Sequence, residues 1–301
     1  MTIQYSLLDV FAESPFQGTQ IPVVLPNGKT LSDQAKTTIA GEFHQTETIF
    51  IESINNEKVF SVYNEKGKTL FGAHTILAGS FAAHELGLTI DEGNFASFQI
   101  SQNQQKIDSY IDKSNSDFGS IQFARTLAPT IDRYTPEIKH IAEALSLDEK
   151  HISYSKFRPL VVSVDRPILM VPFTKAEHVL NARLNTSGWN NLQSELYTAE
   201  LFLFAPGTIT GTSDFHGRLF HPDLARDFYP PIGGVMPEFI AYLAEQEHTA
   251  EGTHTFIVDR GSKDSRKSVV HVEFDKRVGR ETKCRIGGKV IKMGSGSLFF
   301  S

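Results

Sequence analysis

The chain has a single cysteine, Cys284, among its 301 residues. One thiol cannot form an intramolecular disulfide or a cysteine-cluster zinc site, and it also excludes a racemase that works with two opposed thiols. Basic residues are in slight deficit, with 29 Lys and Arg against 35 Asp and Glu and a formal net charge of −6. This balance argues against a general nucleic-acid binder, because such a protein needs a basic surplus to neutralise phosphates.

The chain also lacks a run of the about 18 to 20 uncharged apolar residues that a membrane-spanning helix needs. Its first residues, 1–16, have no basic region, and Asp9 and Glu13 interrupt their apolar run, so we expect no targeting segment. Hydrophobic residues make up 40% of the chain and include 23 Phe, which is enough to bury a sizeable core. The sequence therefore predicts a globular protein of the cytoplasm with no membrane or nucleic-acid partner.

Most of the apolar pattern is typical of β-strands, but two segments differ from it. Residues 75–86 and 235–244 are apolar on most of their circumference, which predicts helices that are buried on all sides. Each follows glycine, at Gly72 and at Gly233-Gly234, and each comes after several strands. Two further helices are expected over 33–43, with Ser32 as N-cap, and over 136–147. Strands are expected at 3–11, 22–25, 48–52, 59–63, 97–100, 107–111, 120–123, 160–164, 168–171, 201–205, 215–220, 255–258 and 269–274.

The two halves therefore share one plan of strands, a glycine-containing turn, a buried helix and more strands. We predict an α+β fold of two pseudo-symmetric units, each a sheet around its own central helix, divided near residue 125. Because the two halves do not share residue identities, a single irregular α+β domain is the alternative.

No cofactor or metal signature stands out. The triplets Gly28-Lys29-Thr30 and Gly67-Lys68-Thr69 are not phosphate loops, because the glycine required five positions earlier is replaced by Val23 and Val62. We therefore expect chemistry that needs neither cofactor nor metal.

Three polar residues are candidates for proton transfer. Glu47 lies where a polar turn enters an apolar strand, and His74 begins the first buried helix, where backbone N–H groups favour an anion such as a substrate carboxylate. Asp214 opens the strand over 215–220. Taken singly, each has a plainer interpretation, as a solvated turn glutamate, a capping or core histidine and a turn aspartate. Gly233-Gly234 would offer backbone donors at the second helix, and both helix starts could converge on a cleft between the lobes.

The chain resembles the PhzF-like phenazine-biosynthesis family, whose fold is that of diaminopimelate epimerase. The resemblance runs nearly end to end and rests on the order and spacing of several separate segments. These are Asp9-Val10-Phe11 with Pro15-Phe16-Gln17-Gly18, Thr46-Glu47-Thr48-Ile49-Phe50, Phe71-Gly72-Ala73-His74, Asp214-Phe215-His216-Gly217-Arg218-Leu219-Phe220, and Ile286-Gly287-Gly288-Lys289-Val290.

The resemblance implies two pseudo-symmetric, barrel-like lobes, each a mostly antiparallel sheet around a central helix, with the active site between them. The lobes would be residues 1–125, joined by C-terminal strands at about 285–301, and residues 126–284. The resemblance also implies an acid–base isomerase that is often a homodimer. It implies that Glu47 takes and returns the proton, that His74 supports it as a hydrogen-bond partner, and that Asp214 is an assisting carboxylate. The substrate-binding positions that correspond are Thr19, Gly72, Ala73, Asp227, Tyr229, Gly233 and Gly234.

The chain departs from the family pattern mainly at the second helix entrance, where relatives read E-D-P-x-T-G-S. There Tyr229 replaces the motif's aspartate, Ile232 its threonine and Gly234 its serine, and Asp227 is the nearest carboxylate that could substitute. Ala73 also replaces a glycine, and Thr19-Gln20 replaces Asn-Pro. These changes predict a substrate different from that of the family's namesake, or a weakened activity.

The sequence thus predicts a cofactor-independent isomerase or epimerase that acts on a small, possibly cyclic, carboxylated metabolite. The alternative is a catalytically degenerate relative that binds a ligand or a protein partner. The sequence does not name the substrate.

Overall fold

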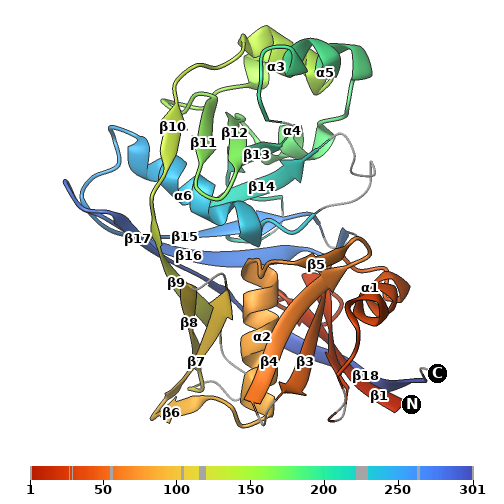
Figure 1. Ribbon diagram of the computed structural model, residues 1–301. Coiled ribbons are helices and arrows are strands. Elements are labelled where there is room, and N and C mark those ends of the chain that lie inside the picture. The colour runs from red at the N-terminus through yellow and green to blue at the C-terminus, as the bar shows by residue number, and fades with distance from the viewer. Residues whose placement is uncertain are drawn as a thin grey trace. The chain divides into compact units, whose positions relative to one another are not determined.

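The computed structural model describes the chain except for residues 1, 27, 29, 55–56, 103–104, 115–119, 199, 210, 222–229, 263–264 and 300–301. Two compact units are present (Figure 1). The N-terminal unit comprises Met1–Arg125 and Ile286–Ser301, and the C-terminal unit comprises Thr126–Arg285.

A six-stranded sheet forms one part of the N-terminal unit, in the order β18-β1-β2-β3-β4-β5. The last strand of the chain, β18, pairs antiparallel with the first, β1, and a bulge falls between Leu7 and Leu8. Strands β2 and β3 are parallel, because the helix α1 (Asp33–Glu42) connects them, whereas β3, β4 and β5 are antiparallel. The bounds are β1 (Thr2–Val10), β2 (Thr19–Leu25), β3 (Thr48–Ile54), β4 (Glu57–Asn64), β5 (Gly67–Thr69) and β18 (Val290–Phe299).

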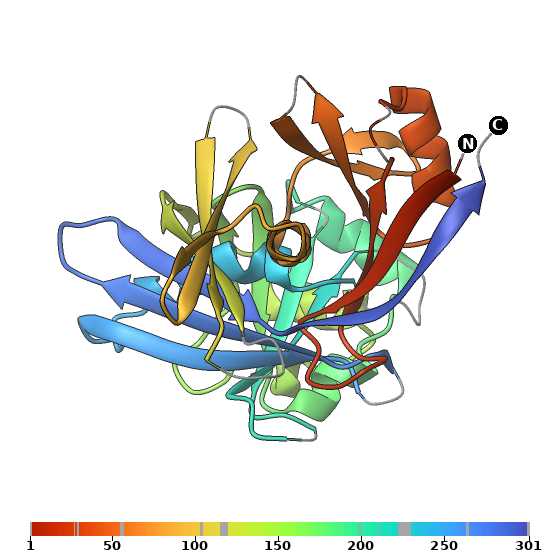
Figure 2. The ribbon, with the colours of Figure 1, turned by 90° about the horizontal axis from the view of Figure 1, so that it is seen from below.

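The helix α2 (Ala73–Glu85) is the centre of the N-terminal unit. Eleven of its thirteen residues, from Ala73 through Ala83, are buried. It packs against β1, β2 and β3 of the six-stranded sheet and against the hairpin strands β7 and β8. Figure 2 looks almost along α2 and shows the strands of its own unit on several sides of it. A helix with no polar face can remove its apolar surface from water only when other elements surround it. The remaining strands are β6 (Ile90–Glu92), β7 (Phe95–Gln102), β8 (Gln105–Asp112) and β9 (Ile121–Leu127).

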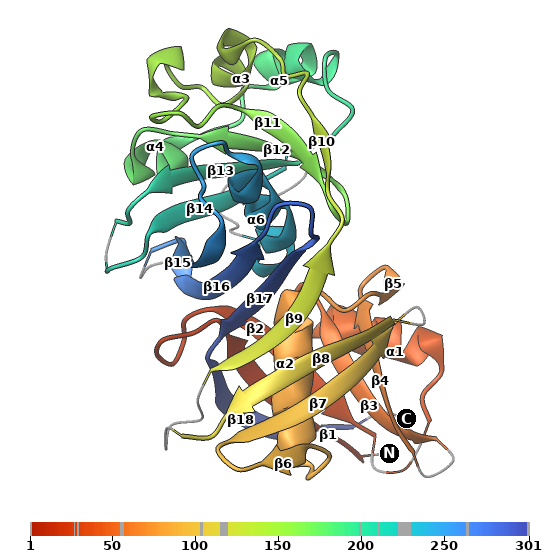
Figure 3. The same cartoon turned by 90° about the vertical axis from the view of Figure 1, so that its left-hand side faces the viewer.

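The C-terminal unit is built on strands in the order β10-β11-β12-β13-β14-β15-β16-β17. The pairs β12–β13 and β14–β15 are parallel and the others with a recorded register are antiparallel. The helix α6 (Met236–Glu245) lies against β11, β12 and β16 (Figure 3). The strand bounds are β10 (Thr130–Asp132), β11 (Leu160–Ser163), β12 (Pro167–Pro172), β13 (Leu201–Pro206), β14 (Phe215–Phe220), β15 (Gly252–Arg260), β16 (Ser268–Lys276) and β17 (Thr282–Gly288).

Aromatic rings fill the space between α6 and this sheet. Phe239 of α6 contacts Phe202 and Phe204 of β13 with ring centroids 5.1 and 4.8 Å apart, and Tyr242 contacts Phe204 at 5.4 Å. Such edge-on contacts contribute stability beyond the area that they bury. The phenylalanines of β13 are therefore core residues.

The predicted α+β class is confirmed. The helices expected at 33–43, 75–86 and 235–244 are present as α1, α2 and α6, with ends that differ by one or two residues. Ser32 caps α1 through its hydroxyl, which accepts the N–H of Ala35 at 3.2 Å. The helix expected at 136–147 is shorter, α3 (Ile138–Ala144). The pattern did not predict two helices that follow β12, α4 (Ala176–Asn181) and α5 (Thr186–Gln193). Two short 3-10 turns complete the unit, η1 (Glu149–His151) and η2 (Gly233–Val235).

Candidate active site

Glu47 is the last residue before β3. The chain leaves α1 through Phe43, and His44 then adopts a left-handed conformation (φ 51°) that turns the backbone toward the sheet. His44 donates its N–H to the carbonyl of Gly41 at 3.1 Å, which closes this turn. The turn brings the Glu47 carboxylate to the mouth of a strand whose first five residues are buried.

His74, the second residue of α2, meets that carboxylate. Its Nε2 lies 2.5 Å from Oε2 of Glu47, although the two residues are 27 positions apart in the sequence. The side chains are 11% (His74) and 16% (Glu47) exposed, so solvent screens the contact only weakly. Two of the residues that the resemblance implies for proton transfer therefore form a partly buried carboxylate–imidazole pair.

The start of α2 shapes the other side of the imidazole. Gly72 is the N-cap in an extended conformation (φ −97°, ψ 178°), and Ala73 is buried. A Cβ added to Gly72 would lie 3.3 Å from Cε1 of His74, so the ring borders the space that a side chain at position 72 would occupy. In the described part of the chain, Nδ1 of His74 is buried and has no hydrogen-bond partner.

Buried hydroxyl groups flank Glu47 in the sequence. Among the described residues, Oγ1 of Thr46 and of Thr48 has no hydrogen-bond partner, and the same holds for Thr19, the first residue of β2. Gly18 sets the start of β2: its φ is 70°, and a Cβ there would come within 2.2 Å of the Val10 carbonyl oxygen. Buried hydroxyls without protein partners are groups that a ligand or a water can satisfy.

Asp214 belongs to the C-terminal unit, where it is exposed and is bound to a neighbouring strand. One of its carboxylate oxygens accepts the N–H of Ile257 at 2.8 Å, and its own N–H donates to the Ile257 carbonyl at 2.9 Å. Asp214 therefore holds the beginning of β14 against β15. Its predicted part in proton transfer stays a prediction.

The next two alternate residues of β14 are also held within the C-terminal unit. The imidazole Nδ1 of the fully buried His216 lies 2.6 Å from Oδ1 of Asp259. The guanidinium of Arg218 donates to the Ala182 carbonyl at 3.0 Å, at the end of α4. The segment 214–220, one of those that carry the family resemblance, is thus bound to the rest of its unit through the side chains at positions 214, 216 and 218.

Asp259 is the centre of a buried polar cluster that the sequence did not reveal. Besides His216, its carboxylate accepts a hydrogen bond from the Thr208 hydroxyl and faces the ammonium of Lys267 at 2.9 Å. Burial by itself would raise the pKa of Asp259, but hydrogen bonds from His216 and Thr208 outweigh it and hold the pKa below its ordinary value. The cluster therefore carries a carboxylate and an ammonium that balance each other.

The predicted glycines at the second helix lie in η2, one turn ahead of α6. Gly233 is buried, and Gly234 is partly exposed with no atom within 4 Å of the position that a Cβ would take. The backbone of this turn is thus reachable on the Gly234 side. Tyr229 and Asp227, the other two predicted positions, lie outside the described residues.

In the residues whose placement is described, no three His, Cys, Asp or Glu side chains gather as a metal site would require. None of the helices there combines the length and apolar character needed to cross a bilayer.

The chain is similar to known proteins over its whole length. An uncharacterized isomerase of Mesorhizobium japonicum is 24% identical over 305 residues, which is 99% of each chain. A phenazine biosynthesis protein of the PhzF family from Bacillus anthracis has the same fold, with a TM-score of 0.79, 18% identity and coverage of 100% of both chains. A predicted epimerase from Pseudomonas aeruginosa gives a TM-score of 0.73 at 22% identity, with 99% of both chains covered.

These structures confirm the fold that the resemblance implied. The sequence profile of the family described as Phenazine biosynthesis-like protein matches residues 8–296. Because that match covers nearly all of the 301 residues, the chain belongs to the phenazine biosynthesis-like protein family.

Proposed function

We propose that the protein is an isomerase or epimerase that moves a proton on a small carboxylated metabolite without a cofactor. The name of the Mesorhizobium relative and the family membership support an isomerase-type enzyme. The observation that carries the residue assignment is the 2.5 Å contact between Glu47 Oε2 and His74 Nε2 at the start of a buried helix.

In this proposal Glu47 is the acid–base group. Its carboxylate takes a proton from a carbon of the substrate, and the electron pair of the broken C–H bond delocalises into the substrate. While protonated, Glu47 exchanges its proton with solvent, and it then delivers a proton to another carbon or to the opposite face of the same carbon. The step is redox-neutral, so it needs neither oxidant nor reductant.

His74 and the start of α2 supply the surroundings for that step. A hydrogen bond from His74 Nε2–H orients the carboxylate and stabilises its ionised form before the first transfer and after the second. The first N–H groups of a helix carry partial positive charge, so the entrance of α2 at Gly72 and Ala73 suits a substrate carboxylate. The buried hydroxyls of Thr19, Thr46 and Thr48 are further groups that a polar substrate could satisfy.

The test is deuterium incorporation from heavy water into a panel of small cyclic and α-amino carboxylates that includes the substrate of the family's namesake. We expect label uptake with the wild-type protein and a loss of at least about a hundredfold in Glu47→Gln. Glu57→Gln, an exposed glutamate on β4, is the matched control and should exchange at the wild-type rate. Equal exchange by wild type and Glu47→Gln would exclude Glu47 as the proton carrier.

The part played by Asp214 is tested separately. An assisting carboxylate predicts that Asp214→Asn lowers the exchange rate in a protein of unchanged stability. A strand-holding role predicts lower stability instead, because the carboxylate that accepts the Ile257 N–H is weakened as an acceptor.

A degenerate, ligand-binding relative is the second candidate function. It is favoured by the second helix entrance, where Gly234 leaves open space at the position of the family's serine. Under this alternative, members of the panel would bind, for example by calorimetry, without any label uptake. Turnover that depends on both Glu47 and His74 would exclude it.

A further inference from the structure

Thr75, the third residue of α2, is completely buried, and its hydroxyl forms hydrogen bonds with the backbone of Gly72. Its hydroxyl oxygen accepts the N–H of Gly72 at 2.9 Å and donates back to the Gly72 carbonyl at 3.1 Å. Helix starts leave N–H groups without partners, and an N-cap side chain usually satisfies one of them. Gly72, the N-cap residue, has no side chain that could do this. Instead, the Thr75 hydroxyl reaches back and accepts the backbone N–H of Gly72, as the N3 side chain does in a capping box.

The His74 ring lies beside Gly72, next to the space that a side chain there would fill. The ring lies so close that a Cβ on Gly72 would be 3.3 Å from Cε1 and 3.6 Å from Nδ1. Nε2, which is bonded to Cε1, lies 2.5 Å from the Glu47 carboxylate. Because Gly72 is the N-cap and His74 the second residue of the same helix, a shift of the helix entrance would also move the imidazole relative to the Glu47 carboxylate.

The same arrangement selects one tautomer of His74. Nδ1 is buried without a hydrogen-bond partner among the described residues, and a proton placed there would be an unsatisfied buried donor. Nε2 faces a carboxylate oxygen, which accepts a proton well. The proton therefore belongs on Nε2, where it is donated to Glu47.

We infer that Thr75 is a positioning residue: through Gly72, its hydroxyl holds His74 in the Nε2–H tautomer that donates to Glu47. The catalytic consequence rests on the proposed function, whereas the effect on His74 does not. A plain packing role for Thr75 is the competing explanation, because a buried β-branched residue also fills space.

The chain offers variants that separate the two explanations. Thr75→Val keeps the volume and removes the hydroxyl, and Thr75→Ser keeps the hydroxyl and removes a methyl group. Ser80→Ala is the matched control, because the Ser80 hydroxyl is also buried in α2, where it donates to the Ile76 carbonyl at 2.8 Å and lies 2.7 Å from the Ser109 hydroxyl. It removes a buried hydroxyl from the same helix, but not from its entrance.

The experiment is ¹⁵N–¹H correlation NMR of the histidine rings in the full chain, with the His74 signals assigned by their loss in His74→Gln. We expect the Nε2–H pattern in wild type, Thr75→Ser and Ser80→Ala, and a displaced or mixed-tautomer pattern in Thr75→Val. If Thr75→Val does not fold, Thr75→Ala takes its place. A wild-type Nδ1–H pattern, or a Thr75→Val spectrum equal to that of wild type, would overturn the inference.

Activity gives a second readout once a substrate exchanges. Thr75→Val should lower kcat roughly tenfold to a hundredfold with little change in KM, because the reacting groups are misplaced while binding is kept. Thr75→Ser should restore most of the rate. The NMR result needs no substrate, so failure of the proposed function and failure of this inference give different outcomes.

Discussion

The buried ion pair between Lys36 of α1 and Glu52 of β3 gives a sharp test of what holds the N-terminal unit together. Lys36 Nζ lies 2.6 Å from Glu52 Oε2, and the side chains are 8% and 2% exposed. The other oxygen of Glu52 accepts the N–H of Leu31 at 2.7 Å, and Lys36 also lies over the ring of Tyr63, 5.3 Å from its centroid. The pair therefore joins α1, the segment before it and the sheet.

Lys36→Met keeps the length of the side chain and removes its charge, which leaves the Glu52 carboxylate buried without its counter-ion. Breaking a buried pair in this way costs about 3–5 kcal/mol, most of it from the uncompensated charge. At a urea m-value of about 2 kcal/mol/M, the midpoint should fall by roughly 2 M. The double variant Lys36→Met/Glu52→Gln should regain most of that loss, because the charge is gone and the Gln carbonyl still accepts the Leu31 N–H.

The two units can be followed separately in the same urea titration. Trp189, the one tryptophan of the chain, is buried in the core of the C-terminal unit, so its fluorescence reports that unit. Far-UV circular dichroism reports both units. The loss in Lys36→Met should appear in the dichroism transition. A loss below about 1 kcal/mol, or a double variant no better than the single one, would refute the reasoning about the buried charge.

Three further predictions concern single groups. Gly18→Ala should cost more than about 1 kcal/mol by urea unfolding, because of the positive φ and the Val10 carbonyl, whereas Gly234→Ala should change stability by less than about 0.5 kcal/mol. Burial raises the pKa of Glu238, so the free energy of unfolding should fall as pH rises above that group's ordinary pKa near 4.5. Glu238→Gln should flatten this part of the pH–stability curve, and an unchanged curve would contradict the raised pKa of Glu238. Burial and the imidazole of His151, whose ring centroid lies 3.8 Å from that of His178, lower the pKa of His178. The free energy of unfolding should therefore fall as pH drops below about 6.5, and His178→Asn should lose that dependence in acid-denaturation curves.

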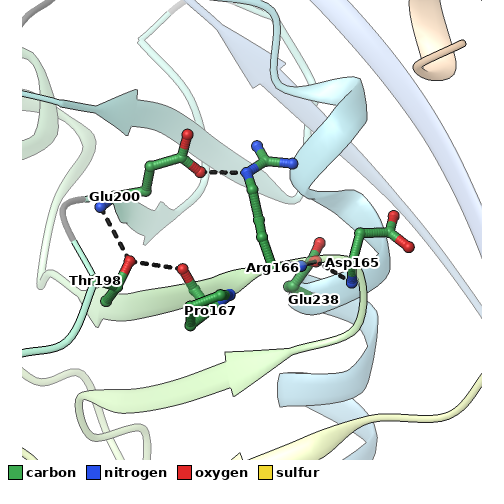
Figure 4. Close-up of polar contacts among 6 residues, drawn as sticks. All are labelled: Asp165, Arg166, Pro167, Thr198, Glu200 and Glu238. Atoms are coloured by element: carbon green, nitrogen blue, oxygen red, sulfur yellow. Dashed lines mark hydrogen bonds and ion pairs between the residues drawn. The ribbon is translucent and has the colours of Figure 1, made fainter. Parts of the chain in front are cut away.

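The Glu238 prediction follows from the contacts in Figure 4. Oε1 of Glu238, on α6, accepts the N–H groups of Asp165 and Arg166 at 2.9 and 3.3 Å, in the turn between β11 and β12. These hydrogen bonds favour the ionised form, but burial outweighs them and the pKa is raised. The same turn is held from its other side by an ion pair between Arg166 and Glu200. Glu238 thus joins the central helix of its unit to a hairpin.

The central helices could be predicted from the sequence, whereas the short helices could not. Residues 73–85 and 236–245 are apolar on nearly every side, a pattern that only a buried helix satisfies. The six residues of α4 carry no such signal, and the carbonyls at the end of that helix are satisfied by Arg218 from β14. In α5, a Cβ on Gly188 would come within 2.7 Å of the backbone at Glu143, so close packing on α3 defines this helix. Tertiary contacts of this kind leave no local pattern.

The contacts of the candidate site could not be predicted from the sequence either. The sequence pointed to Glu47 and His74 one at a time, each with a plainer explanation, and their meeting depends on how α2 packs against the sheet. The buried cluster at Asp259 brings together four residues from positions 208 to 267 and has no local signal at all. A resemblance gives the order of such residues along the chain, but not their partners in space.

The β14 segment shows why that difference matters for assigning roles. Asp214, His216 and Arg218 alternate along the strand, and each binds a group of its own unit. Between them, Gly217 lies so close to Phe202 that a Cβ would come within 2.5 Å of that ring. Packing and hydrogen bonding alone would therefore retain this segment in a protein that had lost its activity. The pair of Glu47 and His74 has no comparable structural partner among the described residues, since Nδ1 of His74 stays unsatisfied and the recorded hydrogen bonds of the Glu47 side chain end at the imidazole. The case for catalysis thus rests on Glu47 and His74, and exchange measured in Glu47→Gln decides it in a way that substitutions in β14 cannot.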